Sequence, residues 1–220
     1  MKQLSNISDR ADIARIESIR VSYQICYDAF EELCELLKSN DQKPNFSEVI
    51  KLLRKAWELI DFANRFATLL IQMRGMKHKD PRMKALIDLK PTIDEMRNLV
   101  QHLTTELLSL PANPAPVLGA LTWTSADRLT GRTACVGYLP SGTNVNSAAF
   151  DRTTGLLVPD IILNAMDHAI NLSETMNVLK GANEQFQELL ISNSWLGDEE
   201  SKPSIFDVNF KIVRSSNTDL

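Results

Sequence analysis

The sequence feature that most limits the possible folds of this chain is an apolar seam along residues 16–37. Its members alternate steps of three and four residues: Ile16, Ile19, Tyr23, Cys26, Phe30, Leu33 and Leu37. Because an α-helix has 3.6 residues per turn, this spacing places them on one face of a single long helix. The seam therefore predicts a long helical partner.

A second helix with two apolar faces is predicted directly downstream. Asn45-Phe46-Ser47-Glu48 is a capping-box pattern that begins it. The first apolar row is Val49, Leu53, Ala56, Ile60, Ala63, Ala67 and Leu70, and the second is Leu52, Leu59, Phe62, Phe66, Leu69 and Met73. The polar stripe keeps a similar spacing: Lys51, Arg54, Glu58, Asp61, Arg65, Thr68 and Gln72. Two apolar rows predict contacts on two sides, so this helix is expected to be central in a bundle.

A third helix is predicted after Gly75, because Asp80-Pro81 is an N-cap followed by proline at the first helical position. Pro91 leaves two alternatives. It either kinks this helix or divides it from a fourth, whose apolar seam runs from Ile93 to Leu110. Since single helices of this kind are not stable alone, residues 1–110 are expected to form an antiparallel bundle of three to four helices.

The composition changes at residues 111–116, where Pro111-Ala112-Asn113-Pro114-Ala115-Pro116 is typical of a linker. In residues 117–220, runs of period two predict a hairpin of 117–124 and 133–139 and further strands at 156–163 and 206–212. A second capping-box pattern, Asn171-Leu172-Ser173-Glu174, predicts a helix to about Ile191. The second half is expected to be a small antiparallel sheet with one helix, packed on or beside the bundle, which makes the fold class α+β.

Composition and charge exclude several broad classes. The 24 Lys and Arg residues against 28 Asp and Glu residues leave a net charge of -4, so a chain-wide attraction to nucleic acid or anionic membranes is not expected. Cys26, Cys34 and Cys135 form no CxxC pair and no disulfide framework. No segment reads as a signal peptide or a membrane span. The expectation is a cytoplasmic protein without membrane association.

Residues for metal or nucleotide chemistry are sparse. The histidines His78, His102 and His168 share no metal-ligand spacing. The chain has no GxSxG, GxGxxG or GxxxxGK[ST] pattern. Neither a bound metal nor a cofactor is therefore expected.

One short motif stands out on the predicted fourth helix: Arg97-Asn98-Leu99-Val100-Gln101-His102. It resembles the RNxxxH signature of HEPN domains. That family consists of α-helical bundles, commonly dimeric, and many members are metal-independent ribonucleases of toxin and antiviral systems. The resemblance covers this motif and the helical first half of the chain.

The resemblance implies an RNA-binding protein or a metal-independent endoribonuclease that acts as a homodimer. Arg97 and His102 would be the catalytic pair and Asn98 a supporting polar residue. On a helix, Arg97 and His102 lie about 140° apart, so a symmetric dimer would be needed to bring two such pairs into one cleft. His102 would then act as base or acid on the ribose 2′-OH, while Arg97 neutralises the phosphorane charge.

The distribution of charge supports an RNA partner. Residues 51–97 contain eleven basic and six acidic residues, a net charge of +5, whereas the remainder of the chain is acidic. Arg74, Lys77 and Lys79 lie in the densest basic stretch and are candidates for binding phosphate. The alternative interpretation is a helix C-terminus whose cations match the helix dipole.

Two alternatives to a catalytic site remain open. Arg97 and His102 are surface residues in the first, either solvated or paired with Asp94, Glu95 or the polar stripe of the second helix. In the second, the protein is a non-catalytic interaction protein. Its long helices would then bind a protein partner, an antitoxin or a scaffold.

Overall fold

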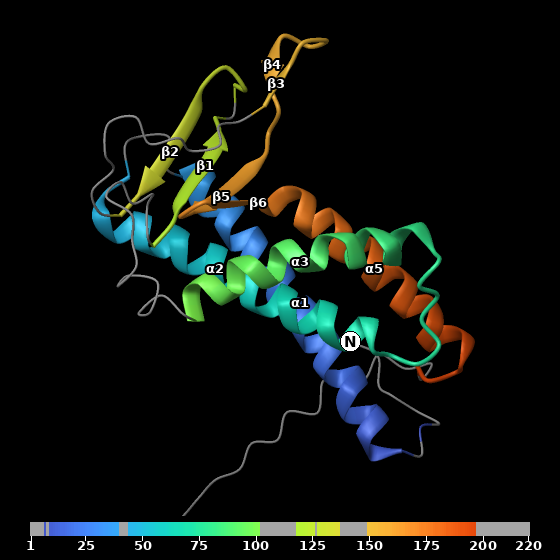
Figure 1. The fold of residues 1–220 in the computed structure, drawn as a ribbon. Coiled ribbons are helices and arrows are strands. Elements are labelled where there is room, and N and C mark those ends of the chain that lie inside the picture. Colours follow the sequence, from blue (N-terminus) through green and yellow to red (C-terminus); the bar gives the residue numbers. More distant parts are fainter. Residues whose placement is uncertain are drawn as a thin grey trace, which may run out of the picture.

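Three long helices begin the structure, a computed structural model that describes residues 7, 9–39, 44–101, 118–125, 127–136 and 149–196 (Figure 1). They are α1 (Arg10–Ser39), α2 (Phe46–Ile71) and α3 (Pro81–Gln101). Short antiparallel strands and a helix, α5 (Leu172–Ser192), follow. The α+β class predicted from the sequence is confirmed. None of the helices in these ranges combines the length and apolarity needed to cross a bilayer.

Helix α2 is the central helix of the bundle, as its two apolar rows predict. It packs against α1 on one side and α3 on the other. Its start at Asn45 is a reciprocal capping box: the Asn45 side chain accepts from the Glu48 amide at 3.1 Å, and the Glu48 carboxylate accepts from the Asn45 amide at 2.7 Å. The seam of α1 is buried where it meets α2, with Ile16, Ile19, Cys26 and Leu33 fully covered.

Pro91 lies inside α3, which continues through it from Pro81 to Gln101. Of the two alternatives for this proline, division of the helix is therefore wrong. Both halves of α3 are held by buried side chains, because Met83 and Leu86 before the proline and Ile93 and Met96 after it are fully covered. The buried side chains on both sides of Pro91 stabilise the helix by more than the loss of one backbone hydrogen bond at the proline destabilises it. The predicted helical residues 102–110 lie outside the described ranges.

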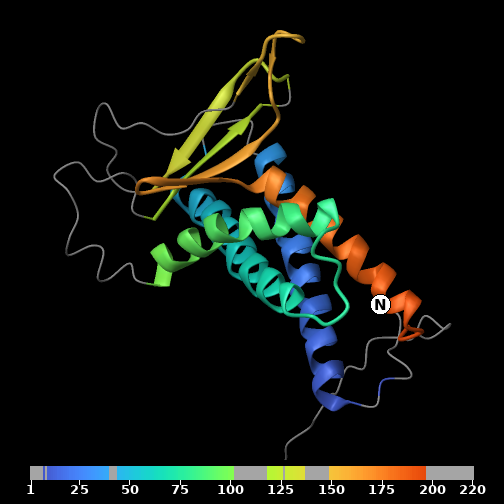
Figure 2. The ribbon, with the colours of Figure 1, turned by 45° about the vertical axis from the view of Figure 1, so that its right-hand side comes forward.

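The sheet has the strand order β2-β1-β5-β6, and each neighbouring pair is antiparallel. Its strands are β1 (Ala120–Thr124), β2 (Gly131–Cys135), β5 (Ile161–Ala165) and β6 (His168–Asn171). The predicted hairpin is the β1–β2 pair. A smaller pair, β3 (Phe150–Asp151) and β4 (Leu156–Leu157), extends away from the helices as a β-arm (Figures 1 and 2).

The strand expected at 156–163 is divided into β4 and the start of β5. The break falls at Pro159 and Asp160, where proline offers no amide to a ladder. His168 lies in β6, and its Nδ1 is 3.5 Å from Glu95 Oε2 of α3. The strand expected at 206–212 lies outside the described ranges.

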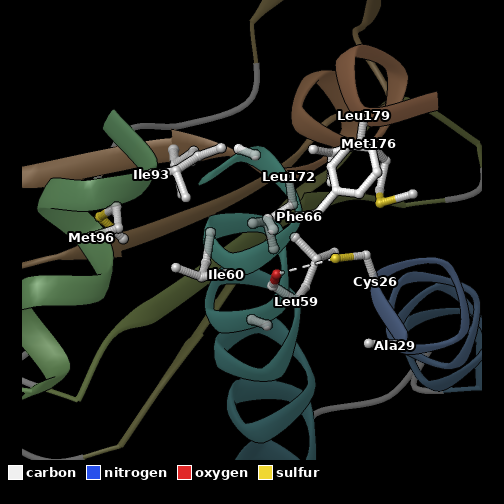
Figure 3. Close-up of a cluster of buried hydrophobic side chains, with 14 of the residues drawn as sticks. Cys26, Ala29, Leu59, Ile60, Phe66, Ile93, Met96, Leu172, Met176 and Leu179 are labelled. Atoms are coloured by element: carbon white, nitrogen blue, oxygen red, sulfur yellow. Dashed lines mark hydrogen bonds between the residues drawn. The ribbon is translucent and has the colours of Figure 1, made fainter. Parts of the chain in front are cut away.

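Helix α5 returns to the helices and packs against α3 and α1. Asn171 caps it, accepting a hydrogen bond from the Glu174 amide at 3.0 Å. Figure 3 shows the shared core, in which Cys26 of α1, Phe66 of α2 and Met176 of α5 lie close together. One continuous apolar cluster therefore spans both halves of the chain, and the sheet adds Leu121 and Leu163 to it.

Candidate functional site

Arg97 lies on α3 and forms an ion pair with α2. Its Nε is 3.2 Å from Asp61 Oδ1, and both side chains are about one third exposed. The other oxygen of Asp61 accepts from Arg65 Nη2 at 2.7 Å, and the Arg65 guanidinium lies 4.8 Å from the Phe62 ring centroid. One carboxylate thus holds two arginines, so the group Arg65–Asp61–Arg97 carries one net positive charge. Of the partners considered from the sequence, the polar stripe of the second helix provides the one that Arg97 contacts.

The Arg97–Asp61 pair borders a pocket of about 610 Å³, here called the α2–α3 pocket. Helix α2 contributes most of its lining: Arg54, Lys55, Trp57, Glu58, Ile60 and Asp61. Helix α3 contributes Arg97 and Gln101, which are one turn apart. A volume of this size is within the range of small-molecule pockets. The lining combines three cations, two carboxylates, one aromatic ring and one amide.

The pocket's side chains are positioned by contacts with neighbouring elements. Lys55 Nζ is 2.8 Å from Glu32 of α1 and 3.0 Å from Glu58. The hydrogen bonds that Lys55 donates to these carboxylates, to Glu32 first, raise its pKa. The Trp57 indole N–H donates to the Leu118 carbonyl at 3.0 Å, which links α2 to the chain just before β1. The pocket wall is therefore fixed by α1 and by the start of the sheet region.

Of the other two candidate residues of the Arg97 motif, the structure describes only Asn98. Asn98 is exposed on α3. His102 lies outside the described ranges, so its pairing with Arg97 in one site stays a prediction. Nearby on the same helix, Asp94 accepts hydrogen bonds from Asn64 and Lys90. That contact binds α3 to α2 one turn before Arg97.

The phosphate-binding candidates lie at the other end of α3. Arg74, Lys77 and Lys79 are exposed in the loop between α2 and α3. Pro81 and Arg97 are separated along the helix by about 24 Å at 1.5 Å per residue, so the two groups do not share one phosphate. The loop is held by the Gln185 side chain, which donates to the Lys77 carbonyl at 3.2 Å. In the part of the chain that the structure describes, no three metal-binding side chains converge.

The sequence alone does not reveal the α2–α3 pocket. The sequence identifies Arg97 as a candidate and places Asp61 in the polar stripe of the second helix, but nothing in it brings Trp57 to the same site. The available signal was the helical spacing of Arg54, Glu58 and Asp61 on the second helix. That spacing predicts a polar stripe on the second helix. Whether Arg97 points toward this stripe depends on the orientation of α3 relative to α2, which the sequence does not give.

Comparison with known proteins, by family model, by sequence and by fold, gives no match for this chain. The resemblance to HEPN domains therefore rests on the Arg97-to-His102 motif and on the helical first half.

Proposed function

We propose that this protein binds RNA at the α2–α3 pocket and cleaves it as a metal-independent endoribonuclease. The observation that supports the proposal is the position of Arg97, the cation of the motif, in the wall of a pocket that also contains Trp57 and two further cations. In proteins that bind single-stranded nucleic acids, bases stack on aromatic rings, and arginines contact both bases and the phosphate backbone. The excess of basic residues in 51–97 adds a local attraction to phosphates.

The proposed reaction needs one proton acceptor, one proton donor and one cation. His102 takes the proton from a ribose 2′-OH, whose oxygen attacks the adjacent phosphorus. The bond to the 5′-oxygen breaks, and that oxygen receives the proton that His102 has taken up, which leaves a 2′,3′-cyclic phosphate and a 5′-hydroxyl. Histidine suits this role because its ordinary pKa of about 6.5 lies near neutral pH. Arg97 neutralises the phosphorane, sharing its charge between the phosphate and Asp61.

The proposed active unit is a homodimer. On a helix that continued through the motif, Arg97 and His102 would diverge by about 140°, so a single chain would not direct both at one phosphate. A twofold axis beside the C-terminal part of α3 would place two motifs in one cleft. Each phosphate would then meet an arginine and a histidine together.

The direct test is RNA cleavage in the presence of EDTA by the wild type and by Arg97→Ala, His102→Ala and Lys84→Ala. Losing acid–base help or the phosphate-neutralising cation should reduce cleavage by about 10²- to 10⁴-fold. Lys84 is the matched control, because it is an exposed cation on the same helix and outside the pocket. Cleavage that needs Mg²⁺, or that persists in His102→Ala, would contradict the proposal.

A second candidate function, a non-catalytic interaction protein, is favoured by the β-arm. Leu129 and Phe150 lie at this end of the sheet and are 68% and 61% exposed. Exposed apolar side chains of this size are common at protein–protein interfaces. This candidate predicts a protein partner that binds the wild type but not Phe150→Ser, together with no RNA binding.

A further inference from the structure

The three cations of the α2–α3 pocket differ in their partners. Lys55 is paired with Glu32 and Glu58, and Arg97 is paired with Asp61. Arg54 is exposed at the pocket rim, and within the described residues no carboxylate lies at ion-pair distance from its guanidinium. Since an anionic ligand does not need to displace a carboxylate there, Arg54 is the pocket's best contact for phosphate.

The wall next to Arg54 is suited to a flat ring. Trp57 follows Arg54 by three residues, so the two side chains are neighbours on one face of α2. The hydrogen bond from the Trp57 indole to the Leu118 carbonyl restrains the ring, and Ile60 adds an apolar surface. A restrained aromatic ring costs little conformational entropy when a base stacks on it.

The opposite wall offers hydrogen bonds to the edge of such a ring. The Gln101 amide, one turn beyond Arg97, presents both a donor and an acceptor. In the described part of the chain, the structure gives this amide no hydrogen-bond partner. The pocket volume of about 610 Å³ leaves room for a base together with its sugar.

We infer that the α2–α3 pocket binds one unpaired nucleotide, with its base against Trp57 and its phosphate at Arg54. The inference rests on the proposed RNA binding and narrows the substrate to single-stranded RNA. In a duplex each base is stacked and paired, so it cannot enter a pocket without being extruded. The pocket therefore distinguishes single strands from duplexes by access to the base rather than by charge.

The test is equilibrium binding of fluorescently labelled 2′-O-methyl RNA, which lacks the attacking hydroxyl and stays uncut. The full-length protein is titrated into the single strand and into the matching duplex, with a nucleoside 5′-monophosphate as competitor. The duplex should bind at least about tenfold more weakly. Trp57→Leu should weaken single-strand binding by about 5- to 150-fold, and Trp57→Phe, which keeps a ring, by much less. Thermal melting verifies that each variant is folded.

Arg54→Ala and Lys51→Ala form the matched pair for the phosphate contact. Both remove one exposed cation from α2, but only Arg54 lines the pocket. Arg54→Ala should weaken single-strand binding about tenfold and lower the slope of log K against log salt by about 0.7, whereas Lys51→Ala should change little. Equal effects of the two variants, or equal affinity for duplex and single strand, would overturn the inference.

These measurements separate the inference from the proposed function. If RNA binds as described but natural RNA is not cleaved, the inference stands and the nuclease activity fails. If RNA is cleaved while Arg54→Ala and Trp57→Leu bind as the wild type does, the inference fails alone. Binding of the free monophosphate without RNA binding would identify a small nucleotide as the ligand and overturn the assignment to single-stranded RNA.

Discussion

Two phenylalanines of α2 allow a matched test of the core. Phe66 is fully buried among α1, α2 and α5, whereas Phe46 is 71% exposed at the helix start. Phe66→Ala should lower the free energy of unfolding by about 3–5 kcal/mol, because it removes buried surface and leaves a cavity. Phe46→Ala should change it by less than about 0.5 kcal/mol. Urea denaturation followed by circular dichroism measures both, and similar losses would contradict the burial described.

Single residues show how far sequence reasoning reaches. The position of Cys26 on the apolar seam predicted its burial, and the structure confirms it. Burial, aided by the Asp61 charge, raises the pKa of this thiol. The sequence offers three alternative partners for Arg97, and the polar stripe of the second helix is one of them. Local patterns do not select Asp61, because it lies 36 positions away and meets Arg97 only through the packing of α3 on α2.

At the scale of elements, α3 and α5 are joined by charged groups at their ends. Arg82 at the start of α3 is 2.8 Å from Glu188 of α5 and 2.9 Å from Asp80. Hydrogen bonds from Arg82 lower the pKa of Asp80 from an ordinary value of 3.8 to about 2, and they also lower the pKa of Glu188. Both carboxylates therefore favour the folded state while they are ionised.

If Arg82 is removed, the stability that these two carboxylates provide should be lost, and the size of this loss should depend on pH. A carboxylate with a lowered folded-state pKa stabilises the protein above its unfolded-state pKa, and this effect is lost as the pH falls through the folded-state value. Arg82→Ala should therefore have a lower melting temperature than the wild type at about pH 6. This difference in melting temperature should shrink between about pH 5 and pH 2. Lys84→Ala should show no such convergence. A difference that stays constant or grows as the pH falls would contradict this.

The elements and the central position of α2 were largely predictable from the sequence, whereas the rest of their assembly was not. Capping patterns at Asn45 and Asn171 and the β1–β2 hairpin were predicted from local signals, and the structure confirms them. The continuation of α3 through Pro91 and the docking of α5 against the first helices depend on long-range packing. A pocket between α2 and α3 requires that packing, so local patterns did not reveal it.

At the scale of the whole molecule, the proposed chemistry depends on a second copy. The wild type should sediment at twice the mass of one chain at micromolar concentration, because the helical spacing of the motif predicts that one chain does not direct Arg97 and His102 at the same phosphate. Sedimentation equilibrium with and without single-stranded RNA provides the measurement. A monomer under both conditions would remove the dimeric active site, whereas RNA binding at the α2–α3 pocket would not be affected.

Ultraviolet cross-linking of single-stranded RNA to the full-length protein, followed by mass-spectrometric mapping, tests the central claim most directly. The account predicts cross-linked nucleotides on peptides from residues 54–61 of α2, above all at Trp57, and near Gln101 of α3. Arg54→Ala should reduce their yield, and Lys51→Ala should not. Cross-links confined to the β-arm, or none at all, would contradict RNA binding at the α2–α3 pocket.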